Sequence, residues 1–187
     1  SRLALKKSDF QPEFIILSNP LGIDSKTIDF AKEISDKVIL EIYSIKEAEH
    51  IQEAGINRII IRGNEAGGLC GYESNSILLE KIKKITSLPI WIQGGIAPES
   101  ALAYYLGGAA GVIITDSILL AKESMGRLQP KDIRSIKAAM RTIALGPSSG
   151  PMIRLATSHG RLVKKIERTF FNIESQDTDE PGKQQQW

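Results

Sequence analysis

The sequence predicts an α/β fold in which short parallel strands alternate with helices. Apolar runs rich in β-branched residues recur at intervals of roughly 20–30 residues, which is the spacing of βα units. The segments between these runs carry apolar residues at helical spacing. Several of the runs end in glycine or in small polar residues, as strands do when their carboxyl ends share one site.

Five strands and four helices follow one another in the first part of the chain. The strands are predicted over residues 14–17, 38–43, 58–62, 90–93 and 111–115. Each strand is short and apolar on both faces, as parallel strands under helices are. The helices are predicted over residues 25–34, 45–54, 76–85 and 98–107. The last helix opens on Pro98 and has Glu99 in its first turn.

The pattern changes after Ser124. A helix is predicted over residues 128–144, a Gly/Pro/Ser loop over 146–151, a short strand over 152–155 and a second helix over 162–171. Residues 173–187 are acidic and then glutamine-rich, which predicts disorder. The predicted organisation is a partial barrel over residues 1–145, a carboxy-terminal extension over 146–172 and a disordered tail over 173–187.

The glycine-rich strand ends favour a barrel over an open sheet. A dinucleotide-binding sheet places one G-x-G-x-x-G signal after its first strand, whereas here such ends recur on several strands. A TIM-type (β/α) barrel closes with eight strands, and about five are visible, so we expect an incomplete barrel that lacks its first two or three units. Residues Ile15, Leu40, Ile60 and Ile92 are expected to point into the barrel, where opposing strands would be missing.

The composition excludes several classes of protein. The 187 residues are 42% hydrophobic and 25% charged with a formal net charge of +2, which is ordinary for a globular protein and predicts no nucleic-acid partner. No apolar stretch approaches the ~20 residues of a membrane span. A single cysteine, Cys70, fits a reducing cytoplasm and predicts a small buried thiol rather than a metal or redox centre. His50 and His159 are predicted to be surface residues.

Two of the strand ends suggest a binding site. Gly94 and Gly95 precede the helix that opens on Pro98, so their amides lie beside a helix N-terminus and predict a phosphate site. The alternative is a tight βα turn without a ligand. Glu65, after the strand over residues 58–62, either orients a ligand or accepts hydrogen bonds from loop amides.

A set of motifs resembles the flavin-dependent barrel family of nitronate monooxygenases (2-nitropropane dioxygenases) and flavin enoyl reductases. They match in order and spacing and are Gly63-Asn64-Glu65-Ala66-Gly67-Gly68, Gly71, Gln93-Gly94-Gly95-Ile96, Gly108-Ala109-Ala110-Gly111-Val112 and Glu123-Ser124. Asn64 before Glu65, the run Ile77-Leu78-Leu79 and the stretch from Trp91 to Ile96 resemble the barrel regions of polyketide and polyunsaturated-fatty-acid synthases. That resemblance implies a fragment of a larger assembly.

The resemblance implies a non-covalently bound FMN. Its phosphate would lie at Gly94-Gly95 and at the loop over residues 115–117, and its isoalloxazine near Gly67-Gly68 and Gln93. The implied cofactor-binding residues are Gly63, Glu65, Gly67, Gly68, Gln93, Gly94, Gly95, Ile96, Thr115, Asp116 and Ser117. No catalytic residue is assigned, and Glu65 is the one candidate.

Two residues depart from the family pattern. Leu69 stands where the monooxygenases have a proton-transferring histidine, and Asp116 brings a negative charge toward the phosphate. Three functions therefore stay open. The first is an enoyl-thioester reductase that acts on an acyl-carrier-bound or small-molecule substrate beside other synthase domains. The second is a nitronate monooxygenase, which Leu69 disfavours. The third is a non-catalytic barrel that serves as a structural or docking module.

Overall fold

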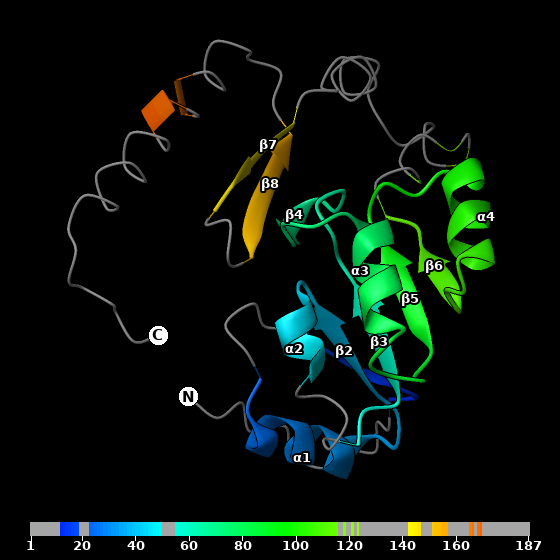
Figure 1. Cartoon of the computed structure of the whole chain (residues 1–187). Helices are drawn as coiled ribbons and strands as arrows, with labels where there is room; N and C mark the ends of the chain where they lie inside the picture. The colour runs from blue at the N-terminus through cyan, green and yellow to red at the C-terminus, as the bar shows by residue number, and fades with distance from the viewer. Residues whose placement is uncertain are drawn as a thin grey trace.

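A parallel five-stranded sheet forms the centre of the molecule (Figure 1). The computed structural model describes residues 12–18, 23–49, 55–115, 142–146 and 151–156, together with Ile118, Ala121, Glu123, Lys165, Ile166, Arg168 and Thr169. The strands are β1 (Ile15–Leu17), β2 (Val38–Ile42), β3 (Arg58–Ile61), β5 (Ile90–Gln93) and β6 (Gly111–Ile113), in the order β1-β2-β3-β5-β6. This arrangement confirms the incomplete α/β barrel.

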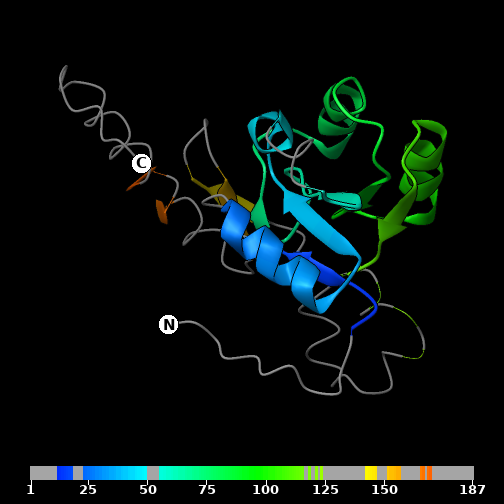
Figure 2. The ribbon, with the colours of Figure 1, turned by 90° about the horizontal axis from the view of Figure 1, so that it is seen from below.

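Four helices cover the outer side of this sheet, as Figures 1 and 2 show. They are α1 (Ser25–Ile34), α2 (Ile45–Glu49), α3 (Asn75–Ile82) and α4 (Pro98–Leu106). Asp24 caps α1, because its Oδ1 accepts a hydrogen bond of 2.8 Å from the Thr27 amide, and Ser74 caps α3 in the same manner at 3.4 Å. Proline begins α4, where a missing N–H costs nothing.

A second, smaller sheet lies beyond the carboxyl end of β3 (Figure 1). It is antiparallel and consists of β4 (Gly68–Cys70), β8 (Met152–Ala156) and β7 (Thr142–Leu145) in the order β4-β8-β7. The sequence did not predict β4, and the helix predicted over residues 128–144 is wrong at residues 142–144, which belong to β7. The strand predicted over residues 152–155 is confirmed by β8.

The register of the large sheet corrects the predicted inward residues. Ile15, Leu40 and Ile92 belong to the cluster that packs under the helices, so the prediction that they point into the barrel was wrong. The opposite face carries the neighbours Glu41, Ile60, Trp91 and Gly111, of which Ile60 was predicted correctly. Because these strands are apolar on both faces, their sequences do not distinguish the two sides.

The remaining element predictions differ from the structure at their ends or fall outside the described residues. Helix α2 is described as far as residue 49 and α3 as far as Ile82, against predicted ends at residues 54 and 85. The described residues of the helix predicted over 162–171 are helical. Residues 50–54, 128–141 and 173–187, with His50 and His159, lie outside the description. The hairpin of β7 and β8 includes residues on both sides of the domain boundary predicted at residue 145. The division into domains stays a prediction.

Two further observations concern composition-based predictions. Cys70 is fully buried, which confirms the small buried thiol. Among the residues that the structure describes, no helix combines the length and the apolar character that crossing a bilayer requires.

We predict that Ile92, in the centre of the large sheet, contributes more to stability than Ile16 on the edge strand β1. Ile92 is fully buried under the helices, whereas Ile16 is 44% exposed on the outermost strand. Ile92→Ala should lower the free energy of unfolding by about 2–5 kcal/mol because it leaves a cavity in a packed core. Ile16→Ala is the control and should cost about 1 kcal/mol or less. Urea denaturation of both variants measures the difference, and equal losses would contradict the burial of Ile92 in a packed core.

Candidate active site at the carboxyl ends of β3 and β5

Asn75 joins the two loops that follow β3 and β5. Its side chain is fully buried, and its Oδ1 accepts a hydrogen bond of 2.7 Å from the Gly63 amide. Its Nδ2 donates to the carbonyl oxygens of Gln93 and Gly94 at 3.3 and 3.1 Å. One side chain therefore sets the distance between the loops that carry most of the predicted site. Sequence reasoning missed Asn75, although an asparagine at the start of a helix next to a glycine-rich strand end is a signal for such a contact.

Glu65 takes the second of the two roles open to it in the sequence. Its Oε2 accepts a hydrogen bond of 2.9 Å from the backbone amide of Asn75, so the carboxylate satisfies a helix N-terminus. Tyr104 of α4 lies close by. Burial raises the pKa of the Tyr104 hydroxyl, and the negative charge of Glu65 raises it further. Glu65 thus stabilises the loop after β3, and its role in binding a ligand stays a prediction.

The predicted glycines divide into two groups. A Cβ on Gly63 would collide with the backbone of Asn75, and one on Gly94 (φ +102°) would collide with the backbone of Ala66. These two glycines are therefore required by the packing of one loop on the other. Gly68 (φ +71°) and Gly95 (φ +64°) are exposed and have left-handed backbone, so their surfaces are open to a ligand.

The beginning of α4 follows directly from Gly95. Ser100 accepts a hydrogen bond of 2.8 Å from the Ala97 amide, and its hydroxyl lies 3.1 Å from the carbonyl oxygen of Gly95. This serine fixes the chain between the glycine pair and the first turn of the helix. The structure therefore places the glycine pair at a helix N-terminus, as the sequence predicted.

The other predicted residues lie around these loops. Gln93 is half-buried at the end of β5, Ile96 is buried behind the glycine pair, Gly67 is exposed, and Thr115 is half-buried after β6. Asp116 and Ser117 lie outside the described residues, so the phosphate loop predicted over residues 115–117 is placed only at Thr115.

A charged cluster that the sequence did not predict lies on the inner face, next to these loops. Arg62 Nη1 is 3.3 Å from Glu41 Oε2, and the two side chains are 15% and 10% exposed. The guanidinium lies 5.9 Å from the centre of the Tyr43 ring, and its Nη2 donates to the Gly67 carbonyl at 2.7 Å. Burial raises the pKa of the Tyr43 hydroxyl, which is 2.9 Å from Ser18 Oγ. The glutamate inside an otherwise apolar strand was the available signal.

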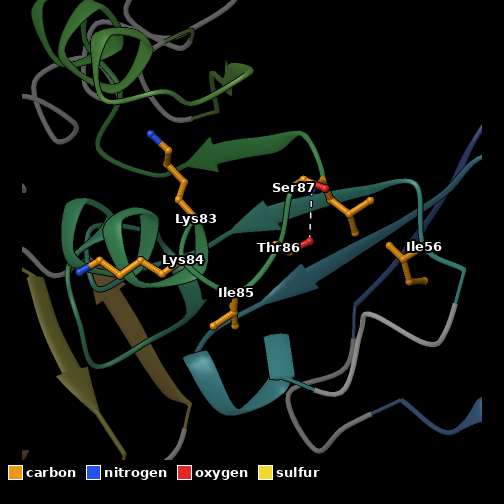
Figure 3. Close-up of a pocket in the computed structure, with 7 residues that line it drawn as sticks. Ile56, Lys83, Lys84, Ile85, Thr86 and Ser87 are labelled. Atoms are coloured by element: carbon orange, nitrogen blue, oxygen red, sulfur yellow. Dashed lines mark hydrogen bonds between the residues drawn. The ribbon is translucent and has the colours of Figure 1, made fainter.

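Cys70 and a hollow at the other end of the sheet lie apart from the residues predicted for the site. Burial raises the pKa of the Cys70 thiol, so the protonated, unreactive form is favoured. The hollow in Figure 3 lies at the opposite, amino-terminal end of β3 and β5, around Ile56 and Thr86. Lys83 and Lys84 extend away from these two residues. Within the described residues, no three histidine, cysteine or acidic side chains come together as metal ligands do.

We predict that Asn75→Ala separates the two loops. The change leaves the Gly63 amide and two carbonyl groups without the partner they have in the structure, which should cost about 2–4 kcal/mol of unfolding free energy. Asn64→Ala is the matched control, because Asn64 donates one exposed hydrogen bond, to the Tyr72 carbonyl. Chemical denaturation gives both values, and amide exchange at Gly63 reports the loop itself. Equal stability of the two variants would show that the Asn75 side chain does not hold the two loops together.

Comparison with known proteins identifies the family of this chain. The family model described as nitronate monooxygenase matches residues 2–179. In sequence, 88 residues are 33% identical to a protein of Rhodococcus jostii (strain RHA1) described as "(3aS,4S,5R,7aS)-5-hydroxy-7a-methyl-1-oxo-octahydro-1H-indene-4-carboxyl-CoA dehydrogenase". The matched part is 46% of this chain and 25% of that protein.

Two solved structures share the fold. FabK from Thermotoga maritima aligns with a TM-score of 0.66 and 26% identity over 87% of this chain and 51% of FabK. Nitroalkane oxidase from Streptomyces ansochromogenes aligns with a TM-score of 0.55 and 20% identity over 79% of this chain and 48% of that enzyme, which supports the fold alone. The chain thus spans about half the length of these two proteins. With a family model that matches nearly its whole length, this chain belongs to the nitronate monooxygenase family.

Proposed function

We propose that the complete protein is an FMN-dependent oxidoreductase and that its substrate is an enoyl thioester. The observation that carries the proposal is the pair of loops that Asn75 holds together at the carboxyl ends of the strands. Ligands of (β/α) barrels bind at this end. A bound FMN would supply hydride transfer to a carbon–carbon double bond.

The described residues fit such a cofactor. A Cβ added to Gly68 would meet only Arg62 Nη2, at 3.8 Å, so the strand leaves room for a flat ring beside Gly67 and Gly68. Gly95 is exposed at the N-terminus of α4, where a phosphate finds amides and the positive end of the helix dipole. In this proposal Gly95, Ile96 and Thr115 lie around the phosphate, and Gly68 and Gln93 lie around the ring.

The substrate class is supported by Leu69 and by one relative. An alkyl side chain transfers no proton, so Leu69 in place of a histidine argues against oxidation of a nitronate. The name of the Rhodococcus protein describes a dehydrogenase of a carboxyl-CoA thioester, which supports a thioester substrate for this chain as well. Location within a multidomain synthase, with an acyl-carrier-bound substrate, is part of the same proposal.

We predict that a side chain at Gly95 prevents flavin binding. Gly95 has a φ of +64°, and a Cβ there would lie 2.9 Å from Glu65 Cβ, so Gly95→Val both strains the turn and fills the space over the amides. The measurement is the flavin absorbance that co-purifies with the complete protein. Gly107→Ala, at the other end of α4 and at a φ of −69°, is the control and should retain flavin.

Retention of flavin by Gly95→Val would place the phosphate elsewhere. Absence of flavin from the unmodified complete protein, with a folded circular-dichroism spectrum, would instead favour a non-catalytic structural barrel.

We predict a strong preference for enoyl thioesters over nitronates. The test compares turnover of a short enoyl-CoA and of a nitronate by the complete protein. Leu69→His should raise nitronate oxidation by at least about tenfold, because an imidazole restores a proton-transferring group. Ile77→His is the control, since Ile77 is 47% exposed on α3 and is not among the implied cofactor-binding residues, so it should leave the ratio unchanged. Efficient nitronate oxidation by the unmodified protein would refute the substrate assignment.

A further inference from the structure

Arg62 brings a positive charge to the edge of the space proposed for the flavin ring. It lies two residues beyond Ile60, so its side chain projects to the inner face of the large sheet. Its Nη2 donates to the Gly67 carbonyl at 2.7 Å. A Cβ added to Gly68 would lie 3.8 Å from the same Nη2. The guanidinium and the space left open by Gly68 are therefore neighbours.

Side chains on β2 and beside it hold this guanidinium in place. Its Nη1 lies 3.3 Å from Glu41 Oε2, and its carbon lies 5.9 Å from the centre of the Tyr43 ring. The Tyr43 hydroxyl donates to the same Glu41 oxygen at 3.3 Å and lies 2.9 Å from Ser18 Oγ. Arg62 therefore does not turn away from Gly68 without breaking several contacts of one network.

The positive charge of this ion pair lies nearer to the open space than the negative charge does. Glu41 contacts Nη1, whereas Nη2, on the other branch of the guanidinium, faces Gly68. The side chains of Arg62 and Glu41 are only 15% and 10% exposed, so water and salt screen both charges weakly. The Nε of Arg62 is also buried, and no described residue accepts a hydrogen bond from it. A ring at this place would therefore lie next to an incompletely compensated cation.

We propose that Arg62 raises the reduction potential of the bound flavin and that Glu41 lowers it. The inference rests on the proposed function, because it takes the ring to lie beside Gly67 and Gly68. A flavin that accepts a hydride from a reduced nicotinamide gains two electrons and one proton, so its charge becomes more negative by one unit. Charge beside the ring is one of the means by which a protein tunes a flavin. A close cation in weakly screened surroundings stabilises the reduced form more than the oxidised form.

The test uses two substitutions that break the same ion pair but change the net charge in opposite directions. Arg62→Gln removes the cation and should lower the two-electron potential by about 30 mV or more, which corresponds to a tenfold change in the reduction equilibrium. Glu41→Gln removes the anion and should raise the potential. The measurement is a reductive titration of the complete, FMN-saturated protein against a dye of known potential, so it does not depend on turnover.

Arg58→Gln is the control for a change of charge outside the site. Arg58 is exposed at the start of β3, four residues before Arg62 and so about 13 Å away along the strand. This separation exceeds the screening length of physiological salt, so the potential should stay unchanged.

Opposite shifts distinguish an electrostatic role from a merely structural one, because loss of the ion pair disturbs the loop in both variants. Shifts in the same direction, or no shift in either variant, would overturn the inference and leave the proposed flavin site standing. Absence of flavin from the unmodified complete protein would instead refute the proposed function, and this inference with it.

A double variant covers the case in which one of the single variants does not fold. A buried charge without its partner is strongly destabilising, whereas Glu41→Gln combined with Arg62→Gln removes both charges together. The potential of the double variant should lie below that of Glu41→Gln and above that of Arg62→Gln. Its comparison with either single variant gives the sign of one charge, and the reverse order would overturn the inference.

Discussion

A single buried amide determines the geometry of the carboxyl end of the sheet. The side chain of Asn75 makes three hydrogen bonds to main-chain groups, and these groups belong to two different loops. A buried amide tolerates no unpaired atom, so neither loop moves without breaking several bonds at once. The close approach of Gly94 to Ala66 strengthens this constraint, because no larger residue fits between the loops. The glycine-rich motif and the glycine pair therefore behave as one rigid unit.

The parts of the fold that are local in sequence were predictable. Helix α1 begins and ends as predicted, because a capping aspartate and an apolar stripe are both local signals. Strand β4 was not predictable in that way. Its three residues contain a glycine and follow another, and they are extended because β8, far along the chain, pairs with them. Residues 142–144 are a strand because they pair with β8 in a hairpin, although their apolar spacing suits a helix.

The site residues also differ in whether local sequence could predict their role. Sequence reasoning placed the glycines at strand ends but did not separate Gly63 and Gly94, which are needed for packing, from Gly68 and Gly95, whose surfaces are open. That distinction depends on what lies opposite each glycine in space. The ion pair of Glu41 and Arg62 was missed for a similar reason, since it forms between neighbouring strands and depends on their register.

Helix α4 is attached to the sheet much less firmly than the loops that Asn75 holds. None of its residues is fully buried, its packing rests on Ala101 and Tyr104, and Leu102, Tyr105 and Leu106 are 60–76% exposed. Local opening of such a helix costs less free energy than global unfolding, so its amides exchange hydrogen faster than those of α3. In the function we propose, a ligand at Gly95 would contact the first turn of α4 and would bind only the closed form. Occupancy of the proposed site would therefore be coupled to the folding of this helix, and protection of α4 against exchange would become a measure of ligand binding.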